Sequence, residues 1–319
     1  DLKQLVPEAN ISPTLFGGQR KHLPHKVGSA PPNFCTGLTY SMDPFKITEP
    51  TVISFSGGRT SAYMLWRVLQ SNGGMPDEAI AVFANTGKEE EATLRFVNRC
   101  SKEWGLDIHW LEYQYHPEQK QRFKRVDFAS ASRNGEPFFE LIDQNGSPYL
   151  PNPVARICTV KLKIGVIHNY VRSLGWDHSE NDDWVGIRAD EARRAAKLDR
   201  SRTPLVVAGV TKEMVGQFWD KQSFGLELPS INGVTMHGNC DLCFLKPTHQ
   251  IVSLIKEKPD RALWWMKMEQ HAQTSDKTFG NGARFRKDRP SYKDMHEFAI
   301  KQQDLFDVSE ETIPCYCGD

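Results

Sequence analysis

The chain has 319 residues, 39% of them hydrophobic and 25% charged, and its 40 basic and 40 acidic residues give a formal net charge of zero. This composition is typical of a water-soluble globular protein and excludes a global basic field that would attract nucleic acid. No run of ~18 apolar residues could span a membrane, and the first thirty residues lack an apolar signal core. Seven cysteines without a secretory signal indicate reduced thiols, metal ligands or catalytic groups, so we expect a cytoplasmic protein.

The chain divides by composition into three parts. Residues 1–41 are rich in Pro, Gly and basic residues without a sustained hydrophobic period, which predicts an N-terminal arm or extension. Residues 42–235 carry alternating strand and helix patterns, and residues 236–319 predict a C-terminal helical segment that ends in a cysteine-rich tail.

Strands and helices alternate after Thr51. The pattern predicts strands at 52–55, 79–83 and 108–112 and helices at 61–70 and 89–104. This βαβαβ series predicts an α/β fold with a mostly parallel twisted sheet and helices on both faces.

The rhythm breaks and then resumes. Residues 113–150 contain charges, prolines and Asn/Gly pairs, which predicts an insertion or lid. Beyond them the pattern predicts a helix over 154–174, a strand over 183–188, an apolar run at 204–207 and helices over 211–221 and 259–273. We expect Trp264, Trp265 and Met268 in the last helix to pack in the core.

A Ser/Gly-rich turn follows the first strand directly. The first N–H groups of a helix lack intrahelical partners, and the helix dipole favours an anion there. Two glycines allow a close backbone approach, and three hydroxyls and an arginine add donors and positive charge. These residues are Gly57, Gly58, Ser56, Thr60, Ser61 and Arg59. The turn therefore predicts a phosphate-binding loop, although the GxxxxGK[ST] pattern is absent.

Five cysteines are candidate metal ligands. Cys240 and Cys243 form a CxxC, Cys158 lies in a basic segment with Lys161 and Lys163, and Cys315 and Cys317 lie in the tail. From the residues alone, an iron–sulfur cluster, a structural zinc site and a redox pair are all open. Cys35 and Cys100 show no such partners, and we expect Cys100 to be packed within its helix.

Two basic features complete the candidate set. Arg188 follows a predicted strand end, and its planar guanidinium suits a phosphate or sulfate; Arg193 and Arg194 follow it. The segment 284–289, with Tyr292, interleaves cations and aromatics as single-stranded nucleic acid surfaces do. His237, three residues before Cys240, is either an extra ligand or a polar loop residue.

Four segments in order resemble the phosphoadenosine phosphosulfate (PAPS) reductase-like family of the PP-loop ATP pyrophosphatases. They are the loop Ser56–Ser61, the segment from Phe83 through Asn85, Thr86 and Gly87 to Leu94, the segment Gly186–Arg194, and Thr211–Cys243, together spanning about three-fifths of the chain. The resemblance implies that residues 42–235 form a PP-loop domain that binds ATP or PAPS. The implied nucleotide-binding residues are Ser54, Ser56, Gly57, Gly58, Arg59, Thr60, Ser61, Asn85, Thr86, Gly87 and Arg188.

The resemblance also implies a 4Fe-4S cluster on Cys158, Cys240, Cys243 and Cys315, with Zn as the alternative metal. Cys317 and Arg188 are then the candidate catalytic residues. Thr60 and Asn85 stand where many members of the family carry Asp, which removes two carboxylates that could help to hold Mg²⁺. The tail also lacks the family's ECG-type motif, ending instead in Pro-Cys315-Tyr-Cys317-Gly-Asp.

Three functions therefore stay open. The first is ATP-dependent sulfur transfer (thiolation) onto an adenylated substrate, the second is PAPS or APS (sulfonucleotide) reduction, and the third is a non-catalytic nucleotide-binding module with structural zinc. The implied partners are an adenine nucleotide and a sulfur or electron donor protein, with nucleic acid as one candidate substrate and no membrane.

Overall fold

The computed structural model describes residues 43–176, 183–231, 234–273 and 283–301, all within the unit Met42–Asp319. The predictions made for the arm 1–41, for Cys35 and for the tail cysteines Cys315 and Cys317 lie outside the described residues.

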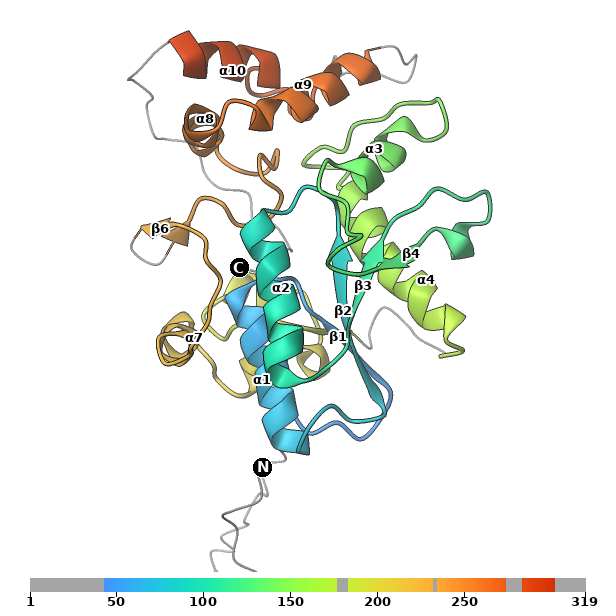
Figure 1. Ribbon diagram of the computed structural model, residues 1–319, viewed down its shortest axis with the longest axis vertical. Coiled ribbons are helices and arrows are strands. Elements are labelled where there is room, and N and C mark those ends of the chain that lie inside the picture. Colours follow the sequence, from blue (N-terminus) through green and yellow to red (C-terminus); the bar gives the residue numbers. More distant parts are fainter. Residues whose placement is uncertain (1–42, 177–182, 232–233, 274–282, 302–319) are drawn as a thin grey trace, which may run out of the picture. The chain divides into compact units, whose positions relative to one another are not determined.

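A five-stranded sheet carries the fold, in the order β4-β3-β2-β1-β5 (Figure 1). Four strands run parallel, namely β1 (Thr51–Ser54), β2 (Ala79–Asn85), β3 (Ile108–Glu112) and β5 (Asp183–Val185), whereas β4 (Lys124–Val126) pairs antiparallel with β3. The structure confirms the predicted α/β fold with a mostly parallel sheet.

The strands are buried on both faces, as expected for a parallel sheet. Because side chains alternate along a strand, Ile53 and its neighbour Val52 enter two different hydrophobic cores. Ile53 packs with α1 (Arg59–Asn72) and α2 (Glu91–Trp104), whereas Val52 packs with α4 (Gly165–Ser173). Figure 1 shows α1 and α2 on one side of the sheet and α4 on the other.

The element ends differ from the predicted ones by a few residues. Helix α1 begins at Arg59, two residues before the prediction, and ends at Gly73, whose φ of 73° is the left-handed C-cap that glycine adopts without strain. Strand β5 ends at Val185 rather than at residue 188. The helix predicted over 154–174 is π-helical over Thr159–Ile164 and α-helical over Gly165–Ser173. It starts later than residue 154 because the Asn152 side chain accepts from the N–H groups of Val154 and Ala155 and holds a turn there.

The segment 113–150 contributes to the sheet and to the core. It contains β4 and α3 (Glu136–Asp143), and the α3 residues Phe138, Leu141 and Ile142 are buried in the same core as α4. The segment predicted as an insertion or lid therefore packs against the sheet in this part, and the apolar face of α3 helps to cover the sheet. Its movement as a lid stays a prediction.

Short elements follow β5. They are α5 (Ala192–Ala195), α6 (Pro204–Val207), α7 (Lys212–Trp219) and the hairpin of β6 (Ser230–Ile231) and β7 (Val234–Thr235). The Thr211 side chain caps α7 by accepting from the Met214 N–H, which explains the predicted helix start.

Three helices close the described chain: α8 (Thr248–Glu257), α9 (Arg261–Ala272) and α10 (Tyr292–Lys301). Trp265 and Met268 of α9 are buried, as predicted, and Trp264 is partly buried against the same core. Within the described ranges, no helix combines the length and apolarity needed to cross a membrane.

Candidate functional site

The Ser/Gly turn lies at the carboxyl end of β1 and leads into α1. Gly57 has a φ of +81°, and a Cβ there would lie 2.7 Å from Thr93 Cγ2, so only glycine fits this position. The Ser56 N–H donates to Ser61 Oγ over 3.2 Å, and Ser61 Oγ donates to the Gly58 carbonyl over 3.1 Å. The buried Ser61 hydroxyl therefore braces the turn, and its contact with a nucleotide stays a prediction.

A cavity of ≈ 250 Å³ opens over this turn. It is lined by five of the six predicted loop residues, Ser56 to Thr60, and by four cations: Arg59, Lys163, Arg188 and Lys212. Arg188 Nη1 donates to Thr60 Oγ1 over 3.0 Å, and its Nε lies 3.1 Å from Asp190 Oδ1. Arg188 is therefore held at the turn, as its position after β5 predicted, although three residues beyond the strand end.

A larger cavity of ≈ 490 Å³ adjoins the carboxyl ends of β1, β2 and β5. Its floor is mainly apolar, with Phe55, Val82 and Ala84, and Ser54 lies at its edge. Five cations also line it: Arg156, Lys163, Arg194, Lys197 and Arg202. Ser56 and Lys163 line both this cavity and the one over the turn. We call the cavity of ≈ 490 Å³ the large cavity and the cavity of ≈ 250 Å³ over the turn the loop cavity.

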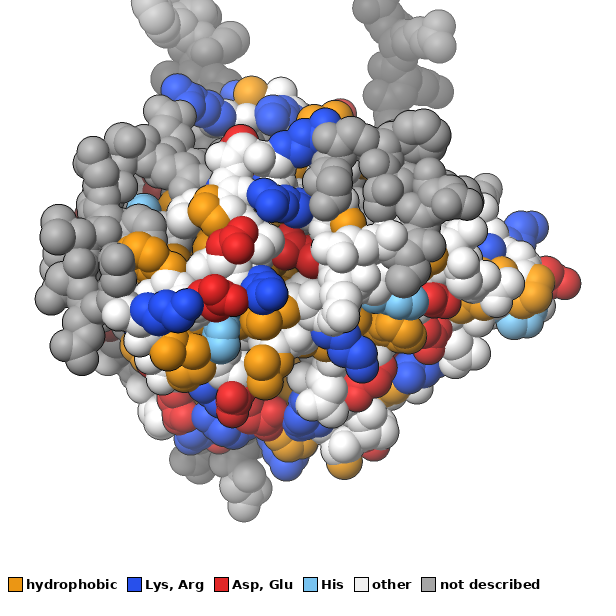
Figure 2. All heavy atoms as spheres, turned by 90° about the horizontal axis from the view of Figure 1, so that it is seen from above, with side chains coloured by type: hydrophobic (Ala, Val, Ile, Leu, Met, Phe, Trp, Pro, Cys, Tyr) orange, Lys and Arg blue, Asp and Glu red, His pale blue; other side chains and the backbone are white. Residues whose placement is uncertain are grey.

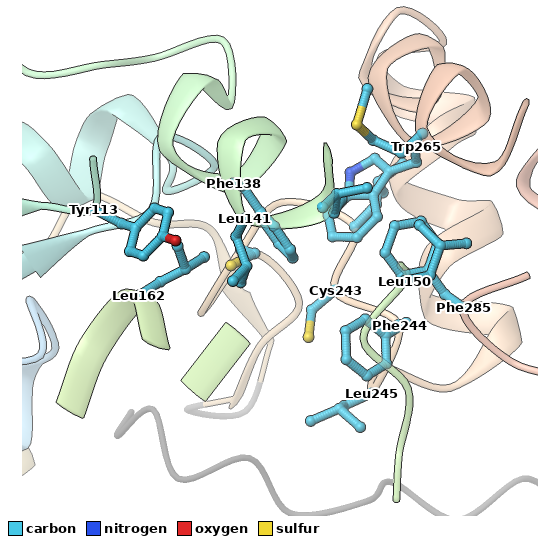
Figure 3. Packing of buried hydrophobic residues seen from close by; sticks show 14 of the residues in the cluster. Tyr113, Phe138, Leu141, Leu150, Leu162, Cys243, Phe244, Leu245, Trp265 and Phe285 are labelled. Atoms are coloured by element: carbon cyan, nitrogen blue, oxygen red, sulfur yellow. The ribbon is translucent and has the colours of Figure 1, made fainter. Parts of the chain in front are cut away.

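Three predicted ligand cysteines come together at a third, small cavity of ≈ 20 Å³. Cys158, at the start of the π-helical segment, lies there with Cys240 and Cys243 of the CxxC, and Lys163 lines it as well. Figure 3 shows Cys243 among Phe138, Phe244 and Trp265. We call this space the cysteine cavity. Lys163 is thus common to all three cavities.

The CxxC turn is fastened to the loop between β2 and α2. Glu89 and Cys240 form an antiparallel bridge, and the Asp241 N–H donates to the Lys88 carbonyl over 2.8 Å. The Asp241 carboxylate lies 3.0 Å from Lys88 Nζ and accepts from Trp265 Nε1 over 2.8 Å. The segment between β7 and α8 is therefore held at the ligand edge of the sheet.

A buried lysine supports the same turn from below. Lys246 Nζ donates to the carbonyl oxygens of Cys240 and Asp241 over 3.0 and 2.9 Å, and the residue is 6% exposed. Burial lowers the pKa of Lys246, and the neighbouring Cys243 and Asp241 oppose that shift by favouring its charged form.

The predicted residues after β2 have different roles. Asn85 is fully buried; its amide donates to Glu112 Oε1 over 2.7 Å and its Oδ1 accepts from the Gly87 N–H. It lines neither the loop cavity nor the large one, so it shapes the turn rather than contacting a ligand. Thr86 faces the cysteines, with its Oγ1 3.5 Å from Cys240 Sγ. Gly87 has a φ of +76°, and a Cβ would lie 3.0 Å from Pro137 Cδ.

In the segment 284–289 with Tyr292, the aromatic rings are not exposed for stacking on nucleic acid bases. Phe285 and Tyr292 are buried in the core, and Arg289 donates to the Lys246 carbonyl, because these side chains complete the packing of α8 to α10. On the face that Figure 2 shows, Lys and Arg side chains are interspersed with Asp and Glu. His237 lies in the loop after β7, as one of its two readings predicted, and it is buried there, with ring nitrogens 3.6 Å from a Glu90 carboxylate oxygen and 3.1 Å from a Glu257 carboxylate oxygen.

The sequence also singled out Cys100 and the two arginines that follow Arg188. Cys100 is buried in α2, as predicted, and burial raises the pKa of its thiol. Arg193 is exposed, whereas Arg194 pairs with Glu191 and lines the large cavity.

Sequence reasoning missed several residues of the site. Lys212, Glu89 and Asn239 line the loop cavity, and Lys246 holds the CxxC turn. Only Glu89 had a signal in the chain: Thr86 and Glu89 have the spacing of a capping box, and Glu89 Oε2 accepts from both the Thr86 N–H and its hydroxyl.

The side chains that line the cysteine cavity include suitable metal ligands. Thiolates are suitable ligands for zinc or an iron–sulfur cluster, and three of the four predicted ligands line one cavity. Among the residues that the structure describes, no group of three or more His, Cys, Asp or Glu side chains is already arranged to hold a metal ion. The donor chemistry fits such a centre, and the fourth predicted ligand, Cys315, lies outside the described residues.

Fold and site define the class: an α/β protein with two cavities at the carboxyl ends of its parallel strands and a cysteine cavity that shares Lys163 with both. No family model matches the chain. The uncharacterized nin region protein ORF290 of Escherichia phage lambda is 31% identical over 213 residues, covering 65% of this chain and 70% of the phage protein. The chain belongs to the family of this phage protein. That relative is uncharacterized, so the similarity indicates common ancestry and does not indicate an activity.

Proposed function

We propose that this protein is a PAPS reductase-like enzyme of sulfur metabolism that binds an adenine nucleotide and uses ATP to transfer sulfur onto an adenylated substrate. The observation that carries the proposal is the position of Lys163, which lines the loop cavity, the large cavity and the cysteine cavity at once. The Lys163 side chain therefore borders both the place proposed for the phosphates and the place of three thiols. Such a neighbourhood suits a reaction that brings an activated phosphate and a sulfur atom together.

The two larger cavities divide a nucleotide between them. The loop cavity supplies the positive dipole end of α1 and four cations for the phosphates. The large cavity, which shares Ser56 with it, has the volume and the apolar floor that suit a nucleoside. Arg188, held by Asp190 and bonded to Thr60, would grip a phosphate oxygen through its planar guanidinium.

Cys158, Cys240 and Cys243, with Cys315, would hold a 4Fe-4S cluster. When bound, the cluster would accept or deliver sulfur or electrons. A volume of ≈ 20 Å³ is room for a single ion, so zinc on the same cysteines needs less rearrangement, and a cluster requires the thiols to move apart. Both metals need reduced thiols, which is consistent with a cytoplasmic location.

Sulfonucleotide reduction is the second candidate. Arg156, Lys197 and Arg202 line the large cavity at some remove in sequence from the loop, and a nucleotide with a further phosphate, as in PAPS, would use them. In that reaction Cys317 would serve as the nucleophile.

The test combines metal analysis with product analysis on anaerobically purified full-length protein. We expect an absorption band near ~400 nm with matching iron and sulfide, and colourless protein holding one zinc would exclude the cluster. Pyrophosphate release from ATP in the presence of an acceptor supports sulfur transfer. Sulfite release from PAPS with a thiol donor supports reduction. Nucleotide binding with neither product leaves a non-catalytic module.

Arg188→Ala tests the phosphate site itself. Losing a bidentate charged contact should weaken nucleotide binding by about tenfold or more, measured by calorimetry. Arg193→Ala, which removes an exposed arginine from the same segment, is the matched control and should leave the affinity unchanged. Equal affinities for the two variants would show that Arg188 does not contact the nucleotide.

A further inference from the structure

Two buried oxygen atoms at the loop cavity have no hydrogen-bond donor. Neither Glu89 Oε1 nor Asn239 Oδ1 has a hydrogen-bond partner within the described part of the chain, and both side chains line this cavity. Leaving such an atom unpaired costs free energy, so buried exceptions require an explanation, of which a bound ion is one. Two of them at one cavity point to a ligand that contacts both.

The fold fixes the position of both oxygens. The Glu89 side chain is 5% exposed. Thr86 donates two hydrogen bonds of 2.8 and 2.9 Å to its Oε2, and these bonds fix the orientation of the carboxylate and therefore the position of Oε1. Asn239 has a φ of +64°, a left-handed conformation that asparagine tolerates, and it immediately precedes Cys240. Because Cys240 forms a β-bridge with Glu89, the two side chains come from adjacent backbone segments.

Their chemistry selects the ligand. A carboxylate and an amide carbonyl are hard oxygen donors, which Mg²⁺ and Mn²⁺ prefer, and Mg²⁺ is commonly held by one or two carboxylates together with substrate phosphates. Glu89 is the one carboxylate among the described residues that line the loop cavity, and four cations surround the rest of it. A phosphate drawn to those cations would complete the coordination of an ion on Glu89.

Lys163 is compatible with this role. Its Nζ lies 3.7 Å from Glu89 Oε1, which is an ion pair but too long for a hydrogen bond, so the lone pairs of that oxygen stay accessible. Because Lys163 also lines the loop cavity, its ammonium can turn to a phosphate when a divalent cation takes its place beside Glu89.

We propose that Glu89 and Asn239 form a divalent cation site that binds Mg²⁺ or Mn²⁺ together with nucleotide phosphates. The Glu89 carboxylate would then do the work of the aspartates that many members of the resembled family carry where this chain has Thr60 and Asn85. The nucleotide part of this inference rests on the proposed function. The two oxygen ligands rest on the geometry alone.

The experiment uses Mn²⁺ as the probe, followed by electron paramagnetic resonance on the full-length protein, with and without a non-hydrolysable ATP analogue. Glu89→Gln should weaken Mn²⁺ binding in the presence of the analogue by at least about tenfold, the lower end of what even an outer-shell metal partner contributes. The affinity for the analogue without divalent cation should change little. Glu91→Gln, an exposed carboxylate two residues away, is the control and should bind Mn²⁺ as the wild type does.

Asn239→Gly provides an independent variant, because glycine suits the positive φ and removes only the amide. It should weaken Mn²⁺ binding as well, and it carries the test if Glu89→Gln proves unfolded in a thermal melt. The site would be overturned if both variants fold and bind Mn²⁺ as tightly as the wild type. It would also be overturned if Glu89→Gln is unfolded and Asn239→Gly binds Mn²⁺ as tightly as the wild type. The site would likewise be overturned if the wild-type protein binds the analogue and Mn²⁺ does not change its affinity for the analogue.

The failure of the nucleotide proposal would look different. If the analogue does not bind but Mn²⁺ alone binds and is lost in both variants, the cation site stands and the nucleotide assignment falls. If neither binds the wild-type protein, both are overturned.

Discussion

Gly57→Ala should destabilise the protein by about 2–5 kcal/mol, through two separable effects. The first is the left-handed backbone: Gly57 has a φ of +81°, which costs an alanine about 1–2 kcal/mol. The second is a collision, because the added Cβ would lie 2.7 Å from Thr93 Cγ2, 3.1 Å from Phe83 Cε2 and 3.3 Å from Val97 Cγ2. Overpacking of this kind costs about 1–3 kcal/mol.

The chain offers a matched control and a rescue. Gly73→Ala has almost the same φ, +73°, but no atom within 4 Å of the new Cβ, so it incurs only the backbone cost. Thr93→Ser removes the colliding methyl group, so the double variant with Gly57→Ala should recover most of the collision cost and none of the backbone cost. Urea unfolding of the wild type and the four variants measures both terms. If Gly57→Ala proves no more costly than Gly73→Ala, the packing of the Ser/Gly turn against α2 described above is refuted.

Two further predictions concern the support beneath the cysteines and the pH dependence of folding. Lys246→Met removes the ammonium donor to the Asp241 carbonyl and one of two donors to the Cys240 carbonyl, which keeps the Cys243 N–H. This loss should cost about 1–3 kcal/mol net in urea unfolding, and a stability equal to that of exposed Lys258→Met would contradict it. The Arg286 hydrogen bond lowers the pKa of Asp288 from 3.8 to about 2, so its contribution is present above pH ~4 and lost as the pH falls towards ~2. Because the Asp288 side chain is 64% exposed, solvent screening reduces the contribution to about 1 kcal/mol or less, and the difference between wild type and Asp288→Asn should vanish at low pH rather than persist.

Local pattern predicted most of the fold because the strands are short, apolar and bounded by clear turns. The strand at 108–112 was predicted to the residue, and the helix over 211–221 was recognisable from its Thr211 cap. Strand β4, within the segment 113–150, was not predicted because its three residues are too few to show a periodic signal. The aromatic residues at 285 and 292 were misjudged for a related reason: burial depends on what packs against them.

The candidate site shows the same division. The loop residues were predictable because a glycine-rich turn between strand and helix has a local meaning. The approach of Cys158 to the CxxC could be expected only through the resemblance, since more than 80 residues separate Cys158 from Cys240. Nothing in the chain indicated Lys246 or Asn239. Lys246 holds the CxxC turn through hydrogen bonds to residues five and six positions before it. Asn239 comes to the loop cavity beside Glu89 because its neighbour Cys240 forms a bridge with Glu89.

The departure at Asn85 has a local physical reason that bears on the missing carboxylates. Asn85 donates its amide to Glu112 Oε1 over 2.7 Å, and Glu112 is fully buried with Lys124 3.1 Å from its other oxygen. An aspartate at this position would set a second carboxylate against the first with one ammonium to serve both, and like charges in a buried site repel strongly. Asn85 is therefore the residue that the Glu112 neighbourhood permits, and the same turn places Glu89, four residues later, at the loop cavity instead. The resemblance to the PAPS reductase-like family implies a carboxylate at position 85. In this chain Glu89 is the residue best placed to supply it.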